Sequence, residues 1–109
     1  MKPDQALRSI TALIVQGCDP EAVLLFGSYA KGQNNLDSDL DILVIGNFPE
    51  SRYLRGHEVQ ELVRRYPIRI DLHLVTPEEV AIESRKPYGF LSSVLASSVT
   101  LYQRPKKGY

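Results

Sequence analysis

The chain has few of the residues that mark several large classes of protein. Cys18 is the only cysteine among 109 residues, so an internal disulfide is excluded, and no Cys/His cluster suggests a zinc site. No apolar run approaches the roughly 18 residues of a membrane-spanning helix, and the N-terminus has no signal-peptide pattern. We therefore expect a soluble, cytoplasmic protein with no membrane role.

Net charge is also lacking, because 13 Lys and Arg residues offset 13 Asp and Glu residues. Domains that mainly bind nucleic-acid backbones are usually strongly basic, so this balance argues against nucleic acid as the partner. Apolar residues make up 43% of the chain and charged residues 24%, as in ordinary globular proteins. The length predicts one domain that covers residues 1–109.

Hydrophobic periodicity predicts helices interleaved with strands. Helices are expected over residues 3–16, 49–66 and 88–96, and a further short helix starts at a capping box with Thr76 as its N-cap. Strands are expected over residues 22–26, 40–45, 68–75 and 99–102. Residues 27–38 read as a loop with one helical turn after Ser28, and the basic segment 104–107 as a frayed end. The fold class is α/β (α+β), with one mixed sheet of about four strands flanked by helices.

Two acidic residues stand at the start of the second predicted strand. Asp39 and Asp41 are two residues apart, so they share a face of the strand. Like charges placed in this way repel each other, and a divalent cation removes the repulsion. Carboxylate oxygens suit Mg²⁺, which usually keeps its other positions for water or substrate phosphate. The alternative is that Asp39 is a turn residue and Asp41 a solvated edge-strand residue.

A third carboxylate interrupts the apolar strand 68–75. Asp71 lies on the opposite face from Ile70 and Leu72, where an unpaired buried charge would be unfavourable. If this strand pairs beside 40–45, cross-strand neighbours lie about 5 Å apart and Asp71 can join the other two aspartates around a metal. Two alternatives remain open, an ion pair with Arg69 and a site on an exposed face of the sheet.

The segment before the acidic pair predicts an anion site. A buried strand runs into Gly27 and Ser28, where free backbone N–H groups and a hydroxyl can receive a phosphate. The alternative is a simple turn with Ser28 as a helix N-cap. A phosphate site and a divalent-ion site about a dozen residues apart together suggest a site for a metal–nucleoside triphosphate.

Three other ligand-binding motifs do not match. A phosphate-binding Walker A loop needs Lys after its last glycine, but Gly32 is followed by Gln33. A calcium-binding EF-hand that started at Asp37 would need glycine at its sixth position, where the chain has Ile42. A dinucleotide fingerprint needs three spaced glycines, one more than this loop supplies.

The spacing of these motifs resembles a known family. Phe26-Gly27-Ser28, ten further residues and then Asp39-Leu40-Asp41-Ile42 are similar to the signature of the nucleotidyltransferase superfamily that includes DNA polymerase beta. The small size resembles its minimal nucleotidyltransferase branch, and the resemblance spans roughly residues 22–102. Ile70-Asp71-Leu72 stands where the family carries its third carboxylate. A nucleotidyltransferase-like fold is implied.

The resemblance implies a role for each of these residues. Asp39 and Asp41 would hold two Mg²⁺ ions, and Asp71 would complete the metal site on the nucleophile side and help to deprotonate the attacking hydroxyl. Gly27 and Ser28 would hold the triphosphate of ATP. An acceptor hydroxyl would attack the α-phosphate, so that AMP is transferred and pyrophosphate released.

Minimal members of this branch resemble antitoxins that silence a HEPN-domain toxin ribonuclease by adenylylating one of its tyrosines. The resemblance thus implies such a toxin as the partner. Two alternatives stay open: an antitoxin that acts by contact alone, and a nucleotidyltransferase subunit for a small-molecule or nucleic-acid acceptor. Lys31 can approach the leaving pyrophosphate, although a solvated lysine is the simpler interpretation, and His73 reads as a surface residue or one that supports the metal ligands.

Overall fold

The computed structural model describes residues 3–30, 32, 39–51 and 54–105. Lys31, for which a role at the pyrophosphate was considered, and residues 106–107 of the basic segment lie outside the described residues. The helices are α1 (Pro3–Cys18), α2 (Gly27–Ala30), α3 (His57–Val63), α4 (Pro77–Glu83) and α5 (Phe90–Ser97). The strands are β1 (Ala22–Phe26), β2 (Leu40–Ile45), β3 (Ile70–Val75) and β4 (Val99–Gln103). The predicted α/β (α+β) class is confirmed.

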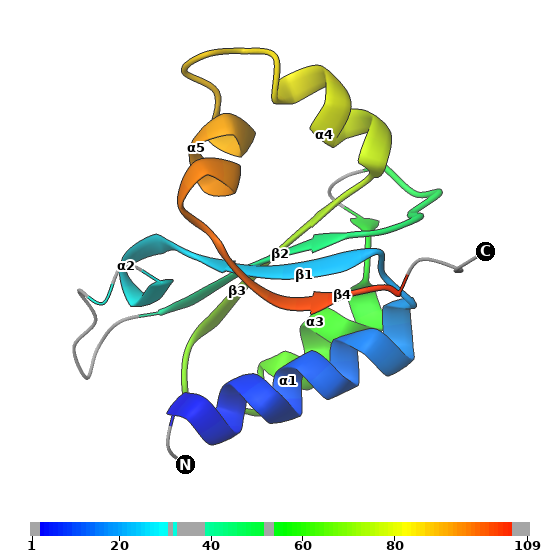
Figure 1. Ribbon diagram of the computed structural model, residues 1–109. Helices are drawn as coiled ribbons and strands as arrows, with labels where there is room; N and C mark the ends of the chain where they lie inside the picture. Colours follow the sequence, from blue (N-terminus) through cyan, green and yellow to red (C-terminus); the bar gives the residue numbers. More distant parts are fainter. Residues whose placement is uncertain (1–2, 31, 33–38, 52–53, 106–109) are drawn as a thin grey trace.

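The four strands form one mixed sheet in the order β3-β2-β1-β4. β1 pairs antiparallel with both β2 and β4, whereas β2 and β3 run parallel. The parallel pair is possible because α3 lies between β2 and β3 in the chain and serves as their crossover connection. Figure 1 shows α1 and α3 on one side of the sheet, with α4 and α5 on the other.

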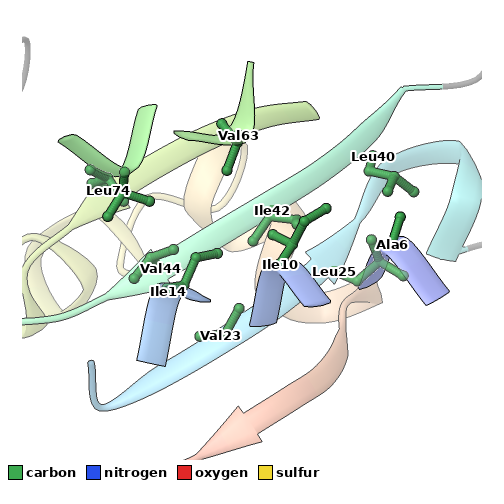
Figure 2. Close-up of a cluster of buried hydrophobic side chains, with 11 residues drawn as sticks. Ala6, Ile10, Ile14, Val23, Leu25, Leu40, Ile42, Val44, Val63 and Leu74 are labelled. Atoms are coloured by element: carbon green, nitrogen blue, oxygen red, sulfur yellow. The ribbon is translucent and has the colours of Figure 1, made fainter. Parts of the chain in front are cut away.

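The larger part of the core lies between the sheet and the pair α1 and α3. Alternate residues of β1 and β2 point to this side, and one face of α1 meets them at helical spacing (Figure 2). Its buried members are Ala6, Ile10, Ile14, Val23, Leu25, Leu40, Ile42, Val44, Val59, Val63 and Leu74. The remaining residues of each strand therefore point to the opposite side.

A smaller cluster covers that opposite side under α5. Leu91 and Val94 of α5 pack on Leu24, Leu43 and Val75 from three strands. Because Asp41 and Asp71 alternate with the residues that face α1 and α3, both carboxylates lie on this side of the sheet.

The expected helix over 49–66 is wrong in its bounds. The observed α3 is His57–Val63, and its N-cap Gly56 has a left-handed φ of 63°, which stops the helix from extending further back. A Cβ on Gly56 would clash with the side chain of Leu74. The buried face predicted for this helix is confirmed at Val59 and Val63.

The segment before α3 is tied to β3 and α4 by Arg55. Its guanidinium donates to the carbonyl of Leu74 (3.1 Å) and to Oε1 of Glu79 (2.5 Å), and it lies 6.0 Å from the ring centroid of Phe48. Glu79 also closes the predicted capping box of α4, because its carboxylate accepts from the Thr76 backbone N–H (2.9 Å). Arg55 thus links two connections at one end of the sheet.

The remaining bounds differ from the expectation by one or two residues. The expected strand 68–75 begins at Ile70, the helix expected over 88–96 is Phe90–Ser97, and α1 continues to Cys18. Among the described residues, no helix is long and apolar enough to cross a membrane.

Candidate active site

The pairing of β2 with β3 brings two of the three aspartates side by side. In this parallel pair Asp41 is in register with Asp71, and in the antiparallel pair β1–β2 it is opposite Phe26. Cross-strand neighbours lie about 5 Å apart, so Asp41 stands between a carboxylate and an aromatic ring. Asp39 is two residues before Asp41, where β2 begins. The strand pairing that the interpretation of Asp71 required is therefore present.

The pKa of Asp41 is affected by the other two aspartates. Partial burial, followed by the nearby charges of Asp71 and Asp39, raises the pKa of Asp41 above its usual value of 3.8, while His73 opposes the rise. An ionised Asp41 is therefore disfavoured in the protein alone. A cation close to the carboxylates would relieve this repulsion.

Arg69, directly before β3, supplies one such cation. Its Nε lies 3.6 Å from Oδ2 of Asp39, and its carbonyl accepts a hydrogen bond from the N–H of Leu40 (2.9 Å). The sequence left open an ion pair between Arg69 and Asp71, whereas the recorded ion pair of Arg69 is with Asp39. The Arg69 side chain is 78% exposed, so this contact is weak and exchangeable.

The glycine that ends β1 touches the acidic group. Gly27 begins α2 with a φ of 78°, and a Cβ built on it would fall well inside van der Waals contact with Oδ2 of Asp41. Only glycine meets both requirements, a left-handed backbone and no side chain. α2 begins at Gly27 itself, whereas the helical turn was expected only after Ser28, and the Ser28 side chain lies outside the described part of the structure.

His73 contributes to an aromatic group beside the aspartates. Its ring lies 5.5 Å from that of Phe26 and 5.3 Å from that of Phe90, centroid to centroid. The phenylalanine rings meet edge to face, 5.7 Å apart. Neither Phe26 nor Phe90 was predicted as a site residue, although Phe26 opens the Phe26-Gly27-Ser28 motif. The position of Phe26 directly before Gly27 was the available signal, but nothing in the sequence links Phe90 to the site.

The chemistry of these donors suits Mg²⁺, because the ion takes carboxylate oxygens. Asp71 and Asp39 both contribute to the raised pKa of Asp41, so a cation bound beside Asp41 would be favoured. As the described side chains stand, no three of their His, Cys, Asp or Glu residues are gathered closely enough to enclose a metal. Asp39, engaged with Arg69, would need to exchange that partner for the ion.

Comparison with known proteins agrees with this geometry. Residues 11–97 match the nucleotidyltransferase domain family. The chain belongs to this family. The match includes the bend at Gly27 and all three aspartates, and it confirms the resemblance noted in the sequence.

Relatives of the chain agree with this assignment. It is 36% identical over 93 residues to a protein of Methanocaldococcus jannaschii named putative protein adenylyltransferase MJ1305. The match covers 81% of this chain and 62% of the relative, so the chain spans less than two thirds of that protein's length.

Two solved structures share the fold. One is a putative nucleotidyltransferase from Sulfolobus solfataricus (TM-score 0.63, 22% identity, 96% of this chain and 83% of that one). The other is a toxin–antitoxin complex with AMP-PNP (TM-score 0.62, 21% identity, 89% of this chain and 73% of that one). The nucleotidyltransferase-like fold is thus confirmed.

Proposed function

We propose that this protein is a Mg²⁺-dependent nucleotidyltransferase that transfers AMP from ATP to a hydroxyl group of a partner protein. The observation that carries the proposal is the register of Asp41 with Asp71, directly against the bend at Gly27. Carboxylates for metal ions and a backbone bend for phosphate are what such a reaction requires. The name of the archaeal relative supports a protein as the acceptor.

The proposal gives each residue of the site a task. Asp39, Asp41 and Asp71 would hold two Mg²⁺ ions, and the backbone at Gly27 and Ser28 would hold the triphosphate. Bound Mg²⁺ supplies positive charge that stabilises the attacking and leaving oxygens. Asp71 accepts the proton of the acceptor hydroxyl as its oxygen bonds to the α-phosphorus, and the bond to the β-phosphate oxygen breaks to release pyrophosphate.

We further propose that the acceptor is a tyrosine of a HEPN-domain toxin and that the protein acts as its antitoxin. The family resemblance supports this partner, and so does the fold shared with a chain of a toxin–antitoxin complex. Cytoplasmic action follows from such a partner.

Labelled ATP tests the reaction. The protein is incubated with Mg²⁺ and a HEPN-domain protein as the candidate acceptor, with the label on either the α- or the γ-phosphate. We expect label from the α-phosphate on the partner, its loss with EDTA, and its loss in the Asp39→Asn and Asp41→Asn variants. Label from the γ-phosphate would indicate a kinase and would overturn the proposal.

The same variants separate catalysis from simple contact. If Asp41→Asn binds the toxin but no longer silences it, transfer is the mechanism of silencing. If the variant silences the toxin as well as the unaltered protein does, the protein acts by contact alone and the enzymatic proposal fails.

A further inference from the structure

One ring of the aromatic group beside the carboxylates is not buried in the core. Phe26 is buried and His73 is half-buried, but Phe90, the first residue of α5, is 48% exposed. Neither neighbouring ring is stacked flat against Phe90, because the interplanar angles are 81° to Phe26 and 46° to His73. Phe90 thus contacts two rings, neither of which is stacked flat against it, and about half of its side chain stays exposed.

The place of this ring in the fold relates it to the reaction. Phe26 lies directly across from Asp41, and His73 is two residues beyond Asp71 on the same face of β3. Both rings that hold Phe90 are therefore immediate neighbours of the proposed metal ligands. Figure 1 shows α5 on the side of the sheet opposite α1 and α3, and α5 contacts α2, which follows the end of β1.

We propose that Phe90 is the stacking platform for the nucleobase of the bound nucleotide. This inference rests on the proposed function, which places the α-phosphate at the aspartates. The base is joined to that phosphate by a single ribose, so it reaches only the immediate surroundings of the carboxylates. Phe90 offers an aromatic face in these surroundings, and a flat base is the part of the nucleotide that gains from stacking on such a face.

The absence of tryptophan from the chain allows a direct test. In the Phe90→Trp variant the introduced tryptophan is the only one in the chain, so its fluorescence can be excited at wavelengths that do not excite the tyrosines. The substitution also keeps an aromatic ring at position 90. We expect ATP with Mg²⁺ to quench its emission, whereas inorganic tripolyphosphate with Mg²⁺ leaves the emission unchanged. Leu95→Trp, at a 37% exposed position of the same helix, is the matched control and responds to neither ligand.

Binding constants give the second readout. Phe90→Ala should weaken ATP binding about tenfold, as the loss of one base–aromatic stack predicts, and leave tripolyphosphate binding unchanged. Phe90→Tyr should bind ATP as the unaltered protein does. Circular dichroism of each variant separates a lost contact from a lost fold.

The outcomes separate this inference from the proposed function. If the unaltered protein transfers AMP and Phe90→Ala binds ATP normally, the platform is overturned alone. If Phe90→Ala instead loses only its binding to the partner protein, the ring is a protein contact and the inference is again overturned. If the unaltered protein binds neither ATP nor tripolyphosphate, both proposals fail together.

Discussion

Asp41 is held where an ionised carboxylate is unfavourable, and this has a consequence for stability. Its pKa in the folded protein lies above the ordinary value of 3.8, chiefly because of burial and then because of Asp71 and Asp39. A carboxyl group of this kind stabilises the fold when protonated. That contribution is lost as the pH rises from 3.8 through the raised pKa, so at neutral pH the charge destabilises the protein.

We therefore expect Asp41→Asn to raise the Tm of the metal-free protein by a few degrees at pH 7. The gain should shrink as the pH falls through the raised pKa and approach zero below about 3.8, where Asp41 becomes protonated in the unfolded state as well. Thermal unfolding followed by circular dichroism across this range measures the effect. Glu50→Gln, at an exposed carboxyl, is the control and should show no such pH-dependent gain. A lower Tm for Asp41→Asn at pH 7 would contradict the expectation.

Gly27 and Gly32 offer a matched pair of substitutions. Both have a left-handed φ, 78° and 71°, but a Cβ at Gly27 would clash with Asp41, whereas a Cβ at Gly32 would meet nothing within 4 Å. Gly32→Ala should cost about 1 kcal/mol of unfolding free energy from backbone strain alone. Gly27→Ala should cost about 3 kcal/mol or more, because the clash adds to the strain.

Urea unfolding measures both costs, and the difference between them isolates the contact with Asp41. We also expect Gly27→Ala to lose ATP binding while Gly32→Ala retains it. Equal costs for the two substitutions would show that the carboxylate moves aside freely and that the bend is not built around it.

At the scale of helices and strands, Arg55 is the tie that holds the segment before α3 to β3 and α4. Its side chain is 8% exposed, and its partner Glu79 is 28% exposed. Arg55→Ala removes from this nearly buried position both the ion pair with Glu79 and the hydrogen bond to the Leu74 carbonyl. Arg55→Ala should therefore lower the free energy of unfolding by about 3 kcal/mol.

The exposed pair Arg64–Glu61 provides the control. Its two side chains are 70% and 51% exposed, so Arg64→Ala should cost less than about 0.5 kcal/mol. Chemical denaturation of both variants tests the contrast. If the two substitutions cost the same, Arg55 does not tie these elements together.

The sequence predicted the strands well because each has a simple pattern. Ile70, Leu72 and Leu74 alternate with Asp71 and His73, and the structure places the two sets on opposite faces of β3. Apolar residues at helical spacing also predicted the buried face of α3. The start of α3 could not be predicted, because it depends on Gly56, which packs against Leu74 from a strand still to come in the chain.

Some features of the candidate site could likewise be predicted from the sequence, and others depend on how the chain packs. The spacing of Asp39 and Asp41 is local, so the chain alone placed them on one face. The register of Asp41 with Asp71 depends on which strands pair, and sequence reasoning could state it only as a condition. Phe90 could not be found at all, since it reaches Phe26 only when α5 packs on the sheet.

At the scale of the whole molecule, repulsion among the carboxylates makes stability depend on the proposed ligand. A cation that binds only the folded state adds stability, about 2.7 kcal/mol at a concentration 100 times its Kd. We expect Mg²⁺ to raise the Tm of the unaltered protein by several degrees and to have much less effect on Asp41→Asn. Differential scanning fluorimetry with Mg²⁺, and with Na⁺ at equal ionic strength, checks this. Equal shifts with both salts would indicate simple screening.

The sheet order also has a consequence for the rate of folding. β1 is the first strand along the chain and β4 is the last, yet they are neighbours, with Leu24 opposite Thr100. The long segment between β1 and β4 must fold back before these two strands can pair, and long-range pairing of this kind slows folding. During synthesis, the backbone groups along one edge of β1 stay unpaired until β4 has been made. A chaperone that shields strand edges would thus be most useful in the interval before residues 99–103 arrive.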